Sequence, residues 1–321
     1  MPDVLGITTP IFLLIGLGFI AVRSGLYAKA ALPALGSFII TFCIPALLFK
    51  SLSQRSIAEV ANASYLLAYA GGSLLTLGAG LLWARTQQQP RDAAAMTAMG
   101  MACANTAFVG YPIALQVVGP EATVALALTM LVENFLMIPL CLALADSAGA
   151  RHEPLALAFG RALLGLRRNP IVLGILGGLA MALLGWHLPA PVMRAVDLLS
   201  MASAAASLFF IGGNLVGLQV GALAGQVSAV AAGKLLLHPL AVLLVLRGVE
   251  VMTGPVAAPL QWSAVLMAAA PMLSIYPILG QRYGQQAVNA ASLLVTTVAS
   301  FATLALVIWL LHTTWDVYLP P

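Results

Sequence analysis

Long apolar stretches, separated by short polar segments, occupy most of this chain. Each stretch runs for about 20 residues, the length that an α-helix needs to cross a hydrocarbon layer of about 30 Å. The sequence therefore predicts an all-α membrane protein without a separate soluble domain. The ten predicted spans are residues 4–22, 32–51, 63–84, 93–117, 122–145, 170–188, 196–218, 227–249, 259–281 and 286–311.

The composition supports a lipid environment. Hydrophobic residues make up 61% of the 321 residues, charged residues only 7%, and the mean hydropathy is +1.01. A soluble globular domain carries about 25% charged residues. This small number of charged residues cannot cover a water-facing surface. Lipid is therefore the expected main solvent. The net charge of +4 is scattered over the connecting segments, so no nucleic-acid partner is expected.

Basic residues are shared unevenly between the two sides of the predicted membrane. With the N-terminus outside, nine lie in cytoplasmic segments and four in outer segments. This bias predicts a multi-pass protein of the cell inner membrane with both termini outside the cytoplasm. The cytoplasmic set is Arg23, Lys29, Arg85, Arg91, Arg151, Arg161, Arg167, Arg168 and Arg282, and the outer set is Lys50, Arg55, Arg194 and Arg247.

Two motifs occur once in each half of the chain. Tyr-Pro-Ile-x-x-Gln at 111–116 returns 165 residues later, and the Pro-Ile pair at 10–11 returns 160 residues later. The first and sixth spans thus correspond, as do the fourth and ninth, and a repeat of five spans must re-enter the membrane from the opposite side. We expect two inverted five-helix repeats, residues 1–146 and 170–321. The cytoplasmic linker between them, 147–169, ends in a predicted interfacial helix.

Prolines interrupt the fourth and ninth spans at corresponding positions. A proline removes a backbone hydrogen bond, and irregular backbone survives in a membrane only when it is buried in protein or lines a wet cavity. We expect both breaks to meet at mid-membrane, where half-helix N-termini would attract a carboxylate; two ordinary kinks are the alternative. The crossover prolines are Pro112, Pro271 and Pro277, and the nearby candidates for substrate contact are Asn105, Thr106, Tyr111, Ser274 and Tyr276.

Three ionisable residues, Glu133, Lys234 and His238, lie well inside predicted spans. A charge there costs about 2.5–3.5 kcal/mol on insertion scales, so it should be paired or face a polar cavity. One interpretation is a static ion pair between Glu133 and Lys234. The other is a fixed cation that favours a bound anion, with Glu133 or His238 exchanging a proton during transport. A packing role is the alternative for His238.

The sequence contains no motif of an enzyme or a metal protein. A phosphate-binding loop, a His-Glu-x-x-His pair and a Gly-x-Ser-x-Gly elbow are all missing. Cys43, Cys103 and Cys141 lie in predicted spans without metal-like spacing, and buried cysteine usually acts as a small apolar residue. We therefore expect no catalytic activity and no cofactor.

The order of several motifs resembles the auxin efflux carrier family, including its bacterial malonate and malate transporter branch. The residues that carry the resemblance are Pro10-Ile11-Phe12-Leu13, Gly25-Leu26, Ile44-Pro45-Ala46, Asn105-Thr106, Gly110-Tyr111-Pro112, Arg168-Asn169-Pro170, Lys234-Leu235 and Ala270-Pro271. The resemblance implies a ten-helix fold shared with bile-acid symporters. In it, spans 1, 2, 6 and 7 form a scaffold, and spans 3–5 and 8–10 form a moving core. It also implies that Asn105 binds the organic anion and that Pro112 and Pro277 mark the crossover.

Two departures narrow the expected substrate. The plant carriers have a long hydrophilic central loop, whereas this chain has about two dozen linker residues. Residues 66–83 of the third span carry no charge, so the plant carriers' acidic and basic pair has no counterpart there. An indole acid is therefore not the expected substrate, and Lys234 is a candidate to replace that pair.

Together these observations predict a secondary transporter of small organic anions, such as malonate or malate, that works by alternating access. Proton coupling, exchange and membrane potential are all open as the driving force, and a homodimer is open as the assembly. The alternatives are a sodium-coupled symporter of the bile-acid type and a membrane receptor that binds its ligand without moving it. A sodium site would require several converging oxygens.

Overall fold

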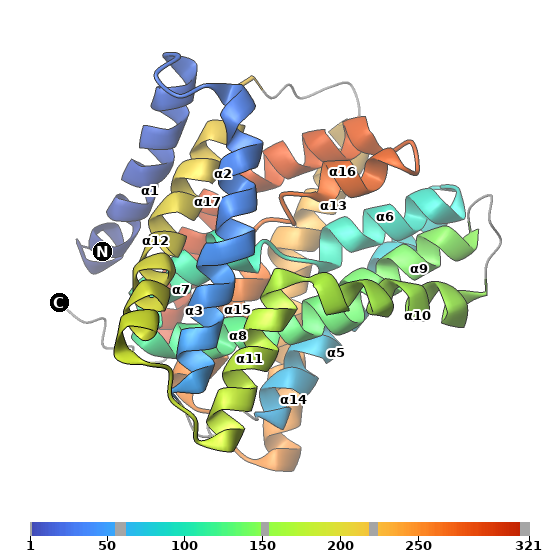
Figure 1. The fold of residues 1–321 in the computed structure, drawn as a ribbon. Helices are drawn as coiled ribbons and strands as arrows, with labels where there is room; N and C mark the ends of the chain where they lie inside the picture. Colours follow the sequence, from blue (N-terminus) through green and yellow to red (C-terminus); the bar gives the residue numbers. More distant parts are fainter. Residues whose placement is uncertain (1, 55–61, 149–153, 218–223, 315–321) are drawn as a thin grey trace.

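The computed structural model describes residues 2–54, 62–148, 154–217 and 224–314 (Figure 1). The elements in these ranges are helical, and the described residues form no strand. Six helical stretches are long and apolar enough to cross a membrane, or seven if Leu155–Arg168 and Pro170–Leu184, bent by 68°, count as one span. An all-α, multi-pass membrane protein is confirmed. Arg55 and Arg151 lie outside the described residues.

The first half of the chain holds five apolar segments, several of which are divided by short irregular turns. The elements are α1 (Pro2–Arg23), η1 (Lys29–Ala31), α2 (Leu32–Phe38), η2 (Ile39–Cys43), α3 (Ile44–Ser53), α5 (Ala63–Thr86), α6 (Arg91–Ala102), η3 (Thr106–Gly110), α7 (Tyr111–Val118), η4 (Gly119–Glu121), α8 (Ala122–Val132), η5 (Glu133–Met137) and α9 (Ile138–Ala148).

The second half begins with a short helix in the predicted linker. Its elements are α10 (Leu155–Gly165), η6 (Leu166–Arg168), α11 (Pro170–Leu184), α12 (Ala190–Asn214), α13 (Ala224–Ala232), η7 (Gly233–Leu237), α14 (His238–Thr253), α15 (Ala258–Ala269), α16 (Tyr276–Gln281) and α17 (Gln286–Thr314). The predicted fourth and ninth spans are each divided, the fourth between α6 and α7 and the ninth between α15 and α16.

Four prolines explain the four π-helical turns in the chain's described part. Each proline stands two residues after such a turn ends, so that it occupies the start of the next α-helix. Because proline has no N–H and clashes with the preceding turn, a wider turn accommodates it without ending the span. The prolines are Pro45 after η2, Pro112 after η3, Pro139 after η5 and Pro239 after η7.

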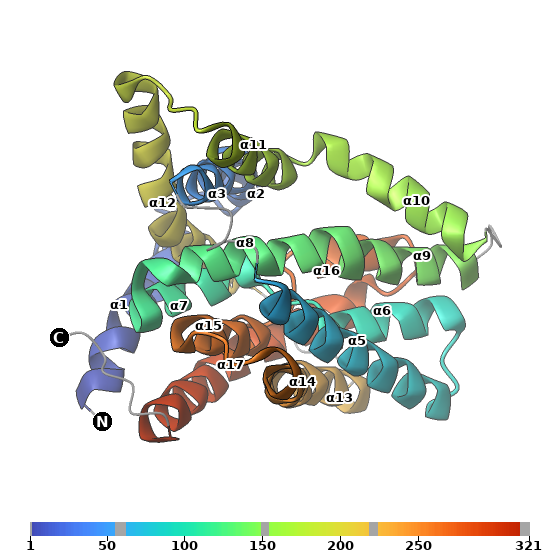
Figure 2. The same ribbon diagram turned by 90° about the horizontal axis from the view of Figure 1, so that it is seen from below.

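The helices form two groups that face each other (Figures 1 and 2). In the first, which we call the α1/α12 group, α1 packs on α12, α12 on α3, and α3 on α11. The second, which we call the crossover group, contains α5 to α9 and α13 to α17, with α5 packed on α14, α6 on α9, and α15 on α8. Helix α10 lies along α9 and leads from the crossover group to α11.

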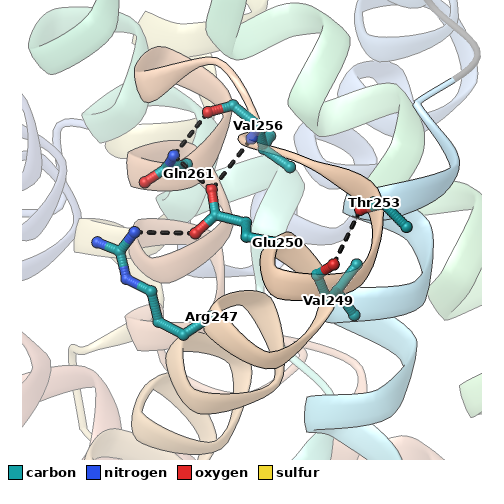
Figure 3. A network of polar contacts seen from close by, with 6 residues as sticks. All are labelled: Arg247, Val249, Glu250, Thr253, Val256 and Gln261. Carbon is teal, nitrogen blue, oxygen red and sulfur yellow. Dashed lines mark hydrogen bonds and ion pairs between the residues drawn. The ribbon is translucent and has the colours of Figure 1, made fainter.

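The turn between α14 and α15 is held by a carboxylate at the edge of the crossover group (Figure 3). Glu250 accepts hydrogen bonds from Arg247 at 2.8 Å, from the Val256 N–H at 3.0 Å and from the Gln261 amide at 2.6 Å. The Gln261 amide also donates to the Val256 carbonyl. This network holds the first turn of α15, the helix that leads into the second break, and fixes the direction in which α15 enters the core.

Two glycines allow the backbones of α1 and α12 to touch. A Cβ added to Gly18 would overlap the carbonyl oxygen of Phe209, and one added to Gly212 would overlap that of Ile15. Lipid tails are as apolar as leucine, so helices in a membrane associate through such close packing rather than through hydrophobic burial. Gly18 and Gly212 therefore hold the α1/α12 group together.

We predict that Gly18→Ala destabilises the protein by about 1–3 kcal/mol, because the added methyl group forces the two backbones apart. Gly16→Ala on the same helix is the matched control, since nothing lies within 4 Å of its added Cβ. Thermal unfolding of both variants in detergent measures the difference. Equal Tm values for the two variants would contradict this packing.

Candidate functional site

The two interrupted spans meet inside the crossover group. Residues 103–105 lie between α6 and η3, and residues 270–275 lie between α15 and α16. Ala104 and Met272 form an isolated antiparallel β-bridge, and the Asn105 N–H donates to the Pro271 carbonyl at 2.7 Å. The unwound segments thus satisfy part of each other's backbone, which two independent proline kinks would not do.

The repeated tyrosine–proline motif begins the second half of each interrupted span. Pro112 and Pro277 stand at the second position of α7 and α16. Proline is well tolerated at Pro277, because the first N–H groups of a helix have no partner within it. Pro112 directly follows η3, whose wider turn accommodates it. Pro271 lies in the break itself and contributes its carbonyl to the crossing.

Glu133, in η5, lies beside the start of the half-helix formed by η3 and α7. Its side chain is buried, with 1% exposure. One carboxylate oxygen accepts from the Ala104 N–H at 2.9 Å and from the Tyr69 hydroxyl at 3.4 Å, and the other accepts from the Thr106 hydroxyl at 3.1 Å. A negative charge is favourable at a helix N-terminus, so Glu133 stabilises the beginning of this half-helix.

Lys234 lies at the opposite kind of helix end. Its fully buried ammonium donates to the Ala268 carbonyl, in the last turn of α15, at 2.6 Å. His238 Nδ1 lies 2.9 Å from the same ammonium, and His238 Nε2 lies 3.0 Å from the Ser73 hydroxyl. A cation is favourable at a helix C-terminus. Glu133 therefore compensates the helix dipole where the second half of the fourth span begins, and Lys234 compensates it where the first half of the ninth span ends.

The static Glu133–Lys234 ion pair that the sequence left open is not formed. Their charged atoms are more than 4.0 Å apart, whereas ion pairs within that distance elsewhere in the described residues include Lys50–Asp197, Arg161–Asp146 and Arg247–Glu250. The two buried charges instead bind separate backbone groups of the two breaks. His238 has a polar neighbour at both ring nitrogens, as the packing role expects of a buried histidine, so its part in proton exchange stays a prediction.

A cavity of about 160 Å³ lies beside the crossing. Asn105, Thr106 and Ser274, from the two breaks, contribute to its wall together with Glu133. The facing wall comes from η2 and α11, so the cavity lies between the two helix groups. The Asn105 amide donates to the Ser274 hydroxyl at 2.6 Å across the crossing. Three of the five predicted substrate-contact residues are thus gathered in one place.

The two tyrosines of the repeated motif are not part of this cavity. The Tyr276 hydroxyl donates to the Met96 carbonyl at 2.8 Å, and the side chain is 1% exposed, so it joins α16 to α6. Tyr111 lines a second cavity of about 600 Å³, between α7 and the α1/α12 group. That cavity also contains Lys50 and Ser200, near the end of α3 and the middle of α12.

Two asparagines of the first cavity were not among the predicted site residues. Asn169 caps α11 by accepting from the Ile171 N–H at 3.0 Å, and its amide donates to the Asn134 side chain at 3.0 Å. This bond connects η5 of the crossover group to α11 of the α1/α12 group. A sequence signal was present, because Asn134 adjoins Glu133 and Asn169 precedes a repeated proline.

Two comparisons with known proteins bear on this site. The family model described as "Membrane transport protein" matches residues 4–310, which include both breaks and both cavities. A protein of Rhizobium meliloti (strain 1021) that is named "Putative malonate transporter" is 30% identical over 325 residues, and this alignment covers 97% of each chain.

We predict that Lys234→Met destabilises the protein by about 1–3 kcal/mol or more, because it leaves the buried Ala268 carbonyl without its donor. Lys50→Met is the matched control. Its ion pair with Asp197 is one-third exposed, and such pairs contribute at most about 1 kcal/mol. Thermal unfolding in detergent compares the two. Similar losses of stability would contradict the role of Lys234 at the end of α15.

Proposed function

The chain belongs to the membrane transport protein family, and we propose that it carries small organic anions of the malonate or malate type across the cell inner membrane. Family membership makes it a multi-pass transporter rather than an enzyme. The observation that carries the choice of substrate class is the cavity at the crossing of two interrupted spans, into which amide and hydroxyl groups converge. The name of the Rhizobium relative supports a malonate-like substrate.

The proposed architecture has ten spans in two inverted repeats, 1–146 and 170–321, joined by 147–169. The packing of the α1/α12 group supports it. If span 1 corresponds to span 6 and span 2 to span 7, contact between spans 1 and 7 requires a matching contact between spans 6 and 2. Helices α1 and α12 form the first contact, and α11 and α3 form the second. The antiparallel bridge at the breaks also fits a two-fold axis in the membrane plane.

We propose that the anion binds in front of the half-helix that begins at Thr106. The first N–H groups of a helix point out of its N-terminus and favour a carboxylate. Asn105, Thr106 and Ser274 add amide and hydroxyl groups to the same wall. A cavity of this kind is mostly apolar, with a few convergent polar groups, as small-molecule sites commonly are.

Alternating access would come from movement of the crossover group against the α1/α12 group, which acts as the scaffold. The cavity lies between these groups, so a relative displacement would open it to one side and then to the other. The hydrogen bond between Asn134 and Asn169 joins the two groups beside the cavity. It would have to break during each transport cycle.

The proposed orientation puts both termini outside the cytoplasm, because this arrangement leaves most basic residues inside. Asn169 is the last residue of the linker that would then face the cytoplasm, so the smaller cavity would lie toward that side. Lys50 would lie on the outer side, together with the larger cavity. Proton coupling and a homodimeric assembly are part of the same proposal. Uptake measured with imposed proton, sodium and voltage gradients tests the coupling.

We predict that Asn105→Ala raises the Kd for malonate at least about tenfold, because it removes a hydrogen bond to a charged ligand. The crossing should survive, since the Asn105 N–H still reaches Pro271. Binding and uptake are measured with purified protein in liposomes against a panel of labelled carboxylates. Asn214→Ala, at the end of α12, is the matched control. An unchanged Kd in Asn105→Ala would remove this residue from the site.

We predict that Asn134→Ala changes the initial rate of malonate exchange about fivefold, because the loss of one hydrogen bond of about 1 kcal/mol shifts the balance between the two states. Asn169 would still cap α11 through its own oxygen. Hydrogen exchange at the start of α11 should rise as the contact between the groups is lost. If hydrogen exchange at α11 and the rate of malonate exchange both match those of the unmodified protein, the Asn134–Asn169 contact does not control the movement.

A further inference from the structure

The cavity at the crossing has an unusual charge inventory for a site that takes dicarboxylates. Of the described residues that line it, Glu133 alone is ionisable, and none is a lysine or an arginine. The remaining polar side chains are the amides of Asn105, Asn134 and Asn169 and the hydroxyls of Thr106 and Ser274. Protein sites for doubly charged anions usually provide arginine or lysine. This cavity offers a carboxylate in their place.

Glu133 has three hydrogen-bond partners, and an ionised carboxylate satisfies all of them together. The Ala104 N–H can only donate, and the Thr106 and Tyr69 hydroxyls lie within hydrogen-bond distance of the two oxygens. In the ionised form, both oxygens of Glu133 accept and no contact is lost. A bound anion would meet this negative charge on the wall of the cavity.

The groups around Glu133 compensate its charge but leave little positive charge to spare. Tyr69 contacts it from α5, while Cys103, just after α6, and Lys234, in η7, interact with it only electrostatically. The Lys234 ammonium does not line the cavity and is bound to the Ala268 carbonyl. Because this cation is held at the end of α15, the attraction for an anion in the cavity comes from the half-helix N-terminus. That end is equivalent to about half an elementary charge.

We infer that the site takes organic anions as monoanions, and that Glu133 is the residue that excludes the dianion. This inference rests on the proposed function and narrows its substrate class to monocarboxylates and to dicarboxylates with one carboxyl group protonated. The ionised carboxylate would face the N–H groups at Thr106. The protonated carboxyl group would donate to one of the amide, hydroxyl or carboxylate oxygens of the same wall. Its proton crosses the membrane on the substrate itself.

The decisive comparison uses malonate and malonamate, its half-amide, which is nearly the same size and keeps one negative charge at any neutral pH. Their Kd values for the purified, unmodified protein are measured at pH values below and above the pKa of the second carboxyl group of malonate. The Kd of malonamate should stay constant. The Kd of malonate should rise about tenfold for each pH unit above that pKa, as the monoanion disappears. A malonate Kd that stays level or falls with pH would overturn the inference.

The variant Glu133→Gln tests whether the charge of Glu133 excludes the dianion. Glutamine keeps an oxygen for the Ala104 N–H, and its amide can donate to the Thr106 hydroxyl, so the crossing should persist. We expect it to bind the malonate dianion at least about tenfold more tightly than the unmodified protein, with a smaller gain for malonamate, which carries one negative charge instead of two. Glu121→Gln, in η4 outside the cavity, is the matched control and should behave like the unmodified protein. An unaltered malonate pH profile in Glu133→Gln would count against Glu133 as the selecting group.

The two measurements separate this inference from the proposed function. If neither malonate nor malonamate binds at any pH, the substrate class itself is wrong. If both bind but malonate prefers alkaline pH, the transporter proposal stands and the monoanion inference falls. If Glu133→Gln elutes as an aggregate from size-exclusion chromatography, the comparison of the two ligands on the unmodified protein still decides.

Discussion

An unpaired backbone N–H or C=O group costs several kcal/mol in hydrocarbon, and this protein interrupts two helices inside its apolar core. In this structure, backbone groups freed at the two breaks find hydrogen-bond partners close by. The bridge between Ala104 and Met272 joins the two unwound segments, while Glu133 and Lys234 bind one backbone group on each side. The cavity, the buried charges and the arrangement of the surrounding helices all follow from the need to satisfy this crossing.

The same requirement explains why charged residues occur where the bilayer opposes them. A glutamate or lysine in the centre of an apolar span is costly by itself. At the end of a half-helix, each meets a dipole of the opposite sign and a backbone group that lacks a partner. Stability and function are therefore linked at Glu133: the carboxylate that holds the half-helix start also sets the charge that the cavity accepts.

The boundary between the two helix groups has a different physical character from the packing within them. Gly18 and Gly212 bring α1 and α12 into backbone contact, which leaves little room for movement inside the α1/α12 group. Across the boundary lie two cavities and the side-chain bond between Asn134 and Asn169. Close packing inside each group and sparse polar contact between them is the arrangement that relative displacement needs.

Hydropathy, repeated prolines and motif order predicted the class of protein, the transport family and the location of the breaks, because long apolar runs and prolines act through local backbone chemistry. They also named Asn105, Thr106 and Ser274 as candidates for substrate contact, and the structure places all three in the wall of one cavity. The three-dimensional packing was needed to show that Tyr276 binds the Met96 carbonyl instead of the cavity, that Glu133 and Lys234 bind separate helix ends, and that Asn134 meets Asn169. These outcomes depend on which side chains face each other between distant segments, and hydropathy and motif spacing carry no information about that.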